Sequence, residues 1–178
     1  MLTETIPDRH VWYRVADPGW DDPCDPEFAA AVGGRWNAPA SFAALYLNED
    51  VVTARINLQL FIAGLPYGPE DLSADAAPVL VHVTLPRAQE VADVHSAGGV
   101  AAVGLPPGYP DDGNGNVVGH DVCQPIGHAA KAAGLRGVRC RSARAIYGAG
   151  RELAWFPATA RSRAVPSTTQ PFRDWFWG

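Results

Sequence analysis

Residues 33–57 read GGRWNAPASFAALYLNEDVVTARIN, and this is the most informative segment of the chain. The two glycines at its start let the backbone approach a neighbouring group closely, and they lead into Arg35, whose planar guanidinium can clamp a phosphate. The apolar run from Ala44 to Leu47 predicts a short buried strand. Within that strand, Tyr46 offers a ring face for stacking and a hydroxyl group, although a core aromatic side chain is an equally good interpretation of Tyr46 taken alone.

A helix is predicted to follow this strand. Asn48 is a favourable N-cap, and the acidic residues 49 and 50 suit the first turn because of the helix dipole. The pattern indicates a helix from residue 49 to about 62, ending near Gly64. Asn57 falls in the middle of this helix, where asparagine is a poor helix former. That position makes Asn57 a candidate functional residue; taken alone, it also fits an ordinary half-buried polar side chain.

Short elements separated by turns are predicted for the rest of the chain. Its 18 glycines and 16 prolines are too many for a helical bundle. Residues 97–119 are rich in glycine, proline, aspartate and asparagine, and they predict a long surface loop. A helix is predicted at residues 124–133, and strands at 12–15, 79–85, 90–94, 138–140 and 153–156. These elements indicate a single α+β domain.

Composition and charge exclude several classes of function. The chain has 178 residues, of which 47% are hydrophobic and 19% charged, as expected of one globular domain. Its net charge of −5 argues against direct nucleic-acid binding by bulk charge. No apolar run reaches the roughly 18 residues of a membrane span, and the N-terminus lacks the pattern of a signal peptide. The three widely spaced cysteines suit a reducing compartment, so we expect a cytoplasmic protein without membrane contact.

The sequence contains no convincing metal-binding pattern. Its five histidines show no i, i+4 pair and no carboxylate or cysteine at ligand spacing. Residues 112–116, DGNGN, resemble the start of a calcium loop, which requires glycine at its sixth position and glutamate at its twelfth. Val117 and Cys123 occupy those positions. We therefore expect no metal.

Four arginines lie close together, at positions 136, 139, 141 and 144. The favoured interpretation is the solvated surface of an edge strand, because arginines commonly protect the edges of sheets. The alternative is an anion-binding site, to which Ser142 would add a hydroxyl donor.

Several motifs together resemble the RES domain family, the toxins of RES–Xre toxin–antitoxin modules. The matching segments are YRV at 13–15, GGRWNAP at 33–39, LYL at 45–47, CQPIG at 123–127, GLRGVR at 134–139 and SAR at 142–144. The resemblance implies a single RES-like domain over residues 1–178, with a core at about 12–156. It also implies a compact α+β fold similar to that of ADP-ribosyltransferases, with antiparallel sheets flanked by helices.

The resemblance implies that the protein binds NAD⁺ as its substrate and cleaves the bond between nicotinamide and ribose. The acceptor is left open: water, phosphate or a protein side chain corresponds to a glycohydrolase, a phosphorylase or an ADP-ribosyltransferase. Arg14 and Arg35 match the family's functional arginines and are expected to bind the pyrophosphate. Tyr46 matches its tyrosine and is expected to pack beside the nicotinamide ribose. Ser142 matches its serine and is expected to hydrogen-bond nicotinamide or ribose.

The family's glutamate, eleven positions after the tyrosine, corresponds to Asn57 in this sequence. A carboxylate stabilises the oxocarbenium-like ribose cation that forms when the bond breaks, whereas asparagine offers only hydrogen bonds. Glu49 and Asp50, about two turns earlier, are not expected to replace it. Asn57→Glu is therefore expected to raise nicotinamide release by about 10²–10³. The alternative function is a catalytically weak or silent RES-fold module that binds a nucleotide or a protein.

Two kinds of protein partner are expected. The resemblance implies a cognate Xre-type antitoxin that neutralises the toxin. The tail at residues 171–178 is too apolar to be left in water, and it is expected to pack on the domain or across a homo-oligomer contact. Its aromatic residues are Phe172, Trp175, Phe176 and Trp177.

Overall fold

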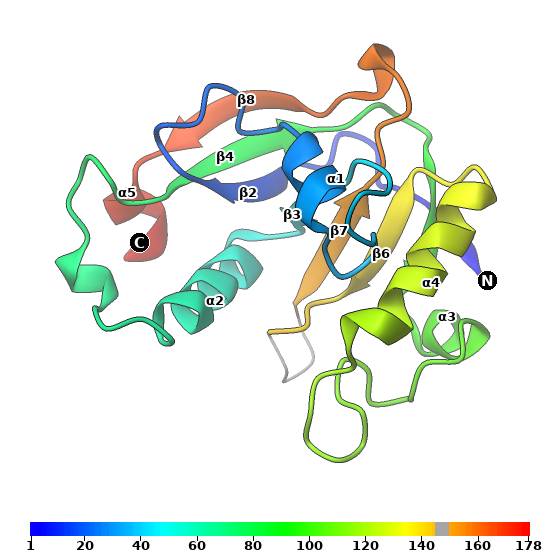
Figure 1. The fold of residues 1–178 in the computed structure, drawn as a ribbon. Helices are drawn as coiled ribbons and strands as arrows, with labels where there is room; N and C mark the ends of the chain where they lie inside the picture. Colours follow the sequence, from blue (N-terminus) through cyan, green and yellow to red (C-terminus); the bar gives the residue numbers. More distant parts are fainter. Residues whose placement is uncertain (145–149) are drawn as a thin grey trace.

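A twisted sheet of eight strands runs through the molecule (Figure 1). The computed structural model describes residues 1–144 and 150–178. The strand order is β1-β5-β6-β7-β3-β2-β4-β8, and neighbouring strands are antiparallel except for the parallel pair β5 and β6. The strands are β1 (Thr3–Thr5), β2 (Trp12–Ala16), β3 (Leu45–Asn48), β4 (Val79–Thr84), β5 (Glu90–Val94), β6 (Gly137–Arg141), β7 (Arg151–Trp155) and β8 (Val165–Gln170).

Helices cover the sheet in two groups (Figure 1). Helix α2 contacts β2 and β3 and is joined by α5, which contacts β4, whereas α3 contacts β5 and α4 contacts β6. The helices are α1 (Glu27–Val32), α2 (Val51–Ile62), α3 (Ala97–Ala102), α4 (His120–Ala132) and α5 (Phe172–Phe176), with short 3₁₀ turns η1 (Pro69–Asp71) and η2 (Ala160–Ser162). In the described part of the chain, no helix combines the length and apolarity needed to cross a membrane. The mixture of helix and sheet confirms the expected α+β class.

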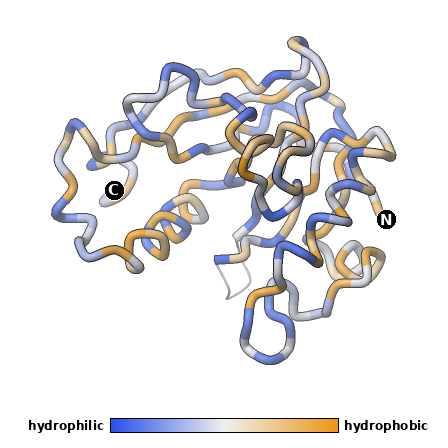
Figure 2. The backbone as a smooth tube through the Cα atoms, in the orientation of Figure 1, coloured by the Kyte–Doolittle hydropathy of each residue, from blue (hydrophilic) through white to orange (hydrophobic). Residues whose placement is uncertain are grey.

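Each group of helices buries its own core against the sheet. The core under α3 and α4 includes Val100, Cys123, Val138 and Phe156. The core under α2 and α5 includes Ala54, Leu58, Leu80 and Trp175. Hydrophobic residues follow the strands and helices, whereas the loop before α4 is hydrophilic (Figure 2). The cores under the two groups of helices are therefore distinct.

Helix α2 begins at Val51, later than the sequence predicted. Asp50, not Asn48, is its N-cap, and Asp50 Oδ1 accepts a hydrogen bond from the Thr53 N–H at 2.7 Å. Asn48 stays in β3, where it pairs with Glu152 of β7. Sheet pairing therefore outweighs the capping preference of Asn48, and the Asn48 side chain is free to bond elsewhere.

The prediction of a surface loop over residues 97–119 is wrong in two respects. Residues Ala97–Ala102 form helix α3, which is capped by the side chain of Ser96. The segment also contributes to the core, through the buried side chains of Leu105, Tyr109 and Val118. These apolar residues are isolated among turn residues, so the overall composition of the segment concealed them.

The aromatic tail forms α5 and docks on the same chain. Phe172, Trp175 and Phe176 are buried against α2 and β4. Arg55 of α2 holds the tail through hydrogen bonds from Nη2 to the carbonyl oxygens of Trp175, at 2.6 Å, and Gly178, at 2.8 Å. Of the two dockings expected from the sequence, the structure shows packing on the domain.

Candidate active site

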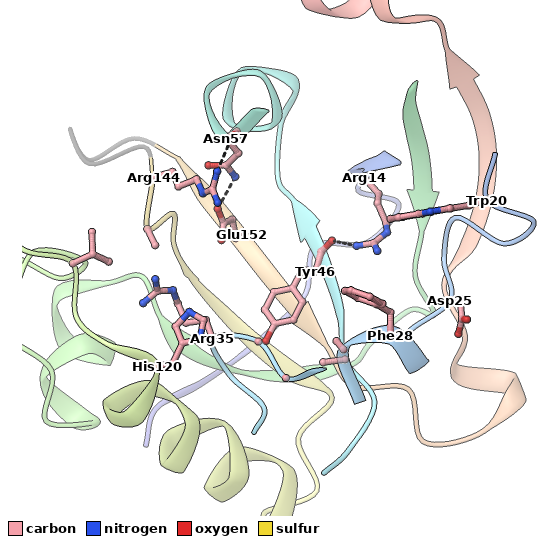
Figure 3. A pocket seen from close by; sticks show the side chains of 16 residues that line it. Arg14, Trp20, Asp25, Phe28, Arg35, Tyr46, Asn57, His120, Arg144 and Glu152 are labelled. Carbon is pink, nitrogen blue, oxygen red and sulfur yellow. Dashed lines mark hydrogen bonds between the residues drawn. The ribbon is translucent and has the colours of Figure 1, made fainter. Parts of the chain in front are cut away.

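A cleft of about 620 Å³ is lined by residues from both groups of helices, among them Asn57 of α2 and His120 of α4. This volume is within the range of about 300–1,000 Å³ that small-molecule sites usually have. Four of the five predicted site residues line it: Arg14, Arg35, Tyr46 and Asn57. Figure 3 shows Tyr46 in the middle, Arg35 and His120 on one side, Arg14 and Phe28 on another, and Asn57, Arg144 and Glu152 grouped together.

The hydroxyl of Tyr46 is engaged by the protein. It donates a hydrogen bond to Asn37 Oδ1 at 2.7 Å and accepts one from the Trp36 N–H at 2.9 Å. Asn37 is buried, and its amide donates to the carbonyl oxygens of Ala29 and Phe42. Burial raises the pKa of the Tyr46 hydroxyl well above its ordinary value, against the opposing hydrogen bond from Trp36. The phenol is therefore neutral, and Tyr46 offers a ligand its ring rather than its hydroxyl.

Close packing around Tyr46 and Trp36 requires glycine at several positions. Gly33 has a φ of +78°, in the left-handed region that favours glycine. A Cβ atom on Gly34 would overlap the Tyr46 hydroxyl, and one on Gly127 of α4 would overlap the Trp36 carbonyl. The segment that begins with these glycines therefore packs tightly against β3 and α4. This packing fixes the direction of the Arg35 side chain.

Arg14 is a fixed cation in one wall of the cleft. Its Nε donates to the carbonyl oxygen of Pro23 at 2.7 Å, and its Nη1 donates to that of Tyr46 at 3.0 Å. The guanidinium carbon lies 5.5 Å from the centre of the Trp20 ring, in a cation–π contact. Burial lowers the pKa of Arg14, but an arginine keeps its charge in proteins.

Arg35 supplies a second cation on the opposite side of Tyr46 (Figure 3). Its Nη1 donates to the carbonyl oxygen of Val118 at 2.6 Å and lies 3.8 Å from Cys123 Sγ. Partial burial and the neighbouring Arg35 charge lower the pKa of His120, which lines the same side of the cleft. The imidazole is therefore neutral at neutral pH, and Arg35 carries the positive charge there.

Asn57 belongs to a cluster of polar side chains at one end of the cleft (Figure 3). Its Nδ2 donates hydrogen bonds to Asn48 Oδ1 at 2.8 Å and to Glu152 Oε1 at 2.6 Å. The Oγ of Ser142 lies 2.7 Å from Glu152 Oε1 and 3.1 Å from Asn57 Oδ1. Because a hydroxyl has one proton, the shorter contact makes Glu152 the acceptor. Ser142 is fully buried, so it contacts the residues that face the cleft rather than the cleft itself.

Glu152 is a site residue that the sequence did not reveal. The strand predicted at 153–156 starts one residue after it, whereas β7 begins at Arg151. Pairing of β3 with β7 sets Glu152 opposite Asn48, and Asn57 of the following helix bonds to both of them. Its signal in the sequence was a lone carboxylate before the apolar run LAWF.

The clustered arginines have different surroundings, and neither interpretation from the sequence holds for all of them. Strand β6, which carries Arg139 and Arg141, is an inner strand between β5 and β7 rather than an edge strand. Arg139 is buried in ion pairs with two glutamates, and Arg141 donates to three main-chain carbonyl oxygens. Arg144 lines the cleft, where its Nη1 donates to the carbonyl oxygen of Asn57 at 3.2 Å.

Glu4, Asp93 and His95 offer ligand atoms that lie within 4.8 Å of one another, a grouping that the spacing of residues did not indicate. Pairing of β1 with β5 brings them together. Glu4 Oε2 accepts from Arg139 Nη1 at 2.9 Å, and Glu4 Oε1 lies 2.7 Å from His95 Nε2. Asp93 Oδ1 accepts from the Ser96 N–H at 2.9 Å. These contacts form an ion-pair network that joins β1, β5 and β6.

Two fixed cations, an aromatic ring and a carboxylate are gathered in one cleft of a mixed α and β domain, and these groups are chemically suited to an anionic ligand that bears rings and hydroxyls. The RES domain model matches residues 11–175, and the chain therefore belongs to the RES domain family. This match confirms the resemblance drawn from the GGRWN and LYL motifs.

The fold is similar to that of a chain in the crystal structure of the M. tuberculosis MbcT–MbcA toxin–antitoxin complex. The TM-score is 0.73 at 23% sequence identity, and the match covers 95% of this chain and 90% of that one. No match to a curated protein was found. The comparison of structures confirms a single domain in which helices flank a sheet.

Proposed function

We propose that this protein cleaves NAD⁺ between nicotinamide and ribose and acts as the toxin of a toxin–antitoxin pair. The observation that carries the proposal is the convergence of Arg14, Arg35 and Tyr46 with the Asn57–Glu152 pair in one cleft. Membership of the RES domain family supports the reaction, and the similar fold of a chain from a toxin–antitoxin complex supports the toxin role.

Both arginines suit the pyrophosphate of NAD⁺. A guanidinium presents a planar fork of donors that matches phosphate oxygens. Main-chain carbonyls already hold part of each fork, so Arg14 and Arg35 are oriented before a ligand arrives. Within residues 1–144 and 150–178, Nη2 of neither arginine donates a hydrogen bond. Such preorganisation reduces the entropy that binding costs.

Tyr46 connects the cationic part of the cleft to the polar cluster. Its ring lies between Arg35 on one side and Arg14 on the other, next to Asn57 and Glu152 (Figure 3). A dinucleotide whose pyrophosphate meets the arginines would set one ribose against this ring, with its base held by stacking. The ribose that carries nicotinamide is then the sugar beside Asn57 and Glu152.

In the proposed reaction, the bond between ribose C1′ and the nicotinamide nitrogen breaks, and its electron pair goes to that nitrogen. Nicotinamide leaves as a neutral molecule, and the ribose carries the positive charge as an oxocarbenium-like cation. A lone pair of the acceptor then bonds to C1′. Water loses a proton in this step and gives ADP-ribose; phosphate gives a phosphorylated ADP-ribose, and a side chain gives an ADP-ribosylated protein.

An antitoxin partner is supported by apolar side chains at the edge of the cleft. Trp20 and Phe28 both line it, yet they are 50% and 70% exposed. Val32, one turn after Phe28 on α1, is 53% exposed. Exposed apolar groups gathered beside a cleft are typical of a protein-binding surface. The proposed antitoxin covers this edge and blocks the cleft.

Controlled expression in a bacterial host tests the toxin role. Induction of the wild-type chain is expected to lower cellular NAD⁺ and stop growth, because no antitoxin is supplied. Arg35→Ala at the same protein level is expected to do neither. If the wild-type chain leaves both growth and NAD⁺ unchanged, the catalytically silent module is the better description.

A further inference from the structure

We propose that Glu152 supplies the carboxylate that opposes the ribose cation, and that Asn57 serves as its hydrogen-bond partner. The inference rests on the proposed cleavage of NAD⁺. It assigns to Glu152 of β7 a role that the family motif places at position 57, in α2. The negative charge that opposes the ribose cation is then not lost but lies at position 152 instead of position 57.

The first support is the exposure of the Glu152 carboxylate to the cleft. Both neighbouring donors, Asn57 Nδ2 at 2.6 Å and Ser142 Oγ at 2.7 Å, bond to the same oxygen, Oε1. Among residues 1–144 and 150–178, no hydrogen bond or ion pair is made to Oε2. Glu152 and Asn57 line the main cleft and also an adjoining cavity of about 530 Å³. One oxygen is therefore anchored, and the other is available to a sugar hydroxyl, with space on both sides.

The second support is the direction of the hydrogen bond between Asn57 and Glu152. Asn57 Nδ2 donates its two protons to Asn48 Oδ1, at 2.8 Å, and to Glu152 Oε1, at 2.6 Å. An ionised carboxylate at position 57 has no proton to donate to either oxygen. It would also stand against the charge of Glu152, and like charges in contact disfavour ionisation of both. A carboxylate at 152 thus requires a donor at 57, and asparagine provides one.

The third support is that the other acidic groups near α2 are already engaged. Glu49 binds Arg139 through both carboxylate oxygens, at 2.6 and 3.0 Å. Asp50 caps α2 through the Thr53 N–H. Asp25 lines the cleft on the far side of Tyr46, near Arg14 (Figure 3). Glu152 is therefore the carboxylate placed beside Asn57 in the described part of the chain.

The chemistry assigned to Glu152 follows from this placement. Its ionised carboxylate accepts a hydrogen bond from a ribose hydroxyl and opposes the positive charge that develops at C1′ as nicotinamide leaves with the bonding electron pair. When water is the acceptor, the carboxylate takes the proton that water loses and returns it to solvent. The balance is NAD⁺ plus water to nicotinamide, ADP-ribose and a proton.

Glu152→Gln removes the charge and keeps the shape of the side chain. We expect the maximal rate of nicotinamide release to fall by about 10²–10³, while calorimetry with ADP-ribose shows an affinity within a few-fold of wild type. Glu70→Gln, a matched change of an exposed glutamate in η1, is expected to leave both unchanged. Melting temperatures of the three proteins establish that each is folded.

An exchange of the two residues separates charge from position. Glu152→Asn alone is expected to lower the maximal rate of nicotinamide release by the same factor as Glu152→Gln. The double variant Asn57→Glu/Glu152→Asn reverses the direction of the hydrogen bond and is expected to recover release to within about tenfold of wild type, which is a strong coupling between neighbours. Recovery would show that the pair needs one carboxylate and one amide.

Three results would contradict the inference, and they differ in which part of it they remove. Wild-type protein that releases no nicotinamide overturns the proposed cleavage and with it the role of Glu152. Wild-type protein that releases nicotinamide, with a folded Glu152→Gln variant that is equally fast, overturns the role of Glu152 alone. A double variant no faster than Glu152→Asn likewise contradicts the reciprocal pairing.

Discussion

At the scale of a single residue, substitution of Arg35 tests whether this side chain binds the pyrophosphate. Hydrogen bonds to charged groups are worth about 1.5–3 kcal/mol each, so Arg35→Ala is expected to weaken binding of ADP-ribose by about 10- to 100-fold. Isothermal titration calorimetry measures this change. Arg163→Ala removes an exposed arginine outside the cleft and is expected to bind as the wild type does. Equal affinity in the wild type and Arg35→Ala would remove Arg35 from the site.

Asn57→Glu is the second test at this scale. The contact between Asn57 and Glu152 leads us to expect the opposite of the gain predicted from the sequence. The new carboxylate would face Glu152, whose Oε1 accepts a hydrogen bond from Asn57 at 2.6 Å. Because two carboxylates in contact resist ionisation together, we expect a lower melting temperature and slower nicotinamide release. Thermal melts and a nicotinamide assay measure both. A large gain in release at an unchanged melting temperature would favour the expectation from the sequence.

Four of the five site residues that the sequence indicated belong to short motifs, and the fifth, Asn57, was identified by its distance from Tyr46. Arg35 and Tyr46 lie in GGRWN and LYL, where the spacing of residues along the chain carries the information. Glu152 was not found because its partner Asn57 is 95 positions away, and only the pairing of β3 with β7 brings them together. The Ser142 position was indicated, but its burial behind Asn57 depends on the same pairing.

At the scale of elements, Glu4 joins the edge strand β1 to the inner strand β6. Burial raises the pKa of this carboxyl, but the hydrogen bond with His95 and the charge of Arg139 outweigh burial, and the pKa lies below its ordinary value of 4.5. A carboxyl whose pKa is lowered on folding stabilises the folded state above its ordinary pKa. It loses that contribution as the pH falls through the lowered value.

Glu4→Gln is therefore expected to melt at a lower temperature than the wild type at neutral pH, with a gap that narrows as the pH falls below 4.5. Thermal melts over a series of buffers, from neutral down to about pH 3, measure the gap. Glu70→Gln serves again as the exposed control. A gap that stays constant over this range would show that the Glu4 charge does not join these strands.

The elements that the sequence predicted well are those with a strong apolar pattern. Strands β4 and β5 were placed within a residue of their ends, because runs of buried valines mark them. Strand β8 was missed because its residues are nearly all exposed, so no apolar alternation reveals it. Strand β1 was also missed, because it has only three residues and lies at the edge of the sheet. Helix α2 was found, but its first turn was misplaced because the ion pair of Glu49 and the sheet pairing of Asn48 are distant contacts.

At the scale of the whole molecule, the C-terminal tail supports the helix that carries Asn57. Removal of residues 171–178 exposes the core beneath α2 and takes away three buried aromatic side chains. Each such side chain contributes about 1.5–3 kcal/mol, so the melting temperature is expected to fall by about 10 °C or more. Nicotinamide release is expected to fall with it, because α2 loses its packing.

Thermal melts and the mass in solution together measure the effect of this truncation. A lower melting temperature with the same number of chains per particle assigns the tail to its own chain. A simultaneous loss of chains from the particle would assign the tail to a contact between copies. An unchanged melting temperature would contradict the packing of α5 on α2.

The cleft is a property of the whole molecule, because several elements must come together to form it. Its walls come from β2, β3, α1, α2, α4 and β7, so residues as far apart in the sequence as Arg14 and Glu152 share one cavity. The family motifs indicate which residues matter, whereas the sheet order determines which of them meet. A change in that order would separate the cations from the carboxylate.

Cleavage of NAD⁺ in this cleft is tested most directly by a time course of nicotinamide release from NAD⁺ incubated with the purified wild-type protein. We predict that nicotinamide accumulates as NAD⁺ disappears, one molecule for each, well above a protein-free blank. Protein that binds ADP-ribose by calorimetry yet releases no nicotinamide above that blank would contradict the claim and identify the cleft as a binding site alone.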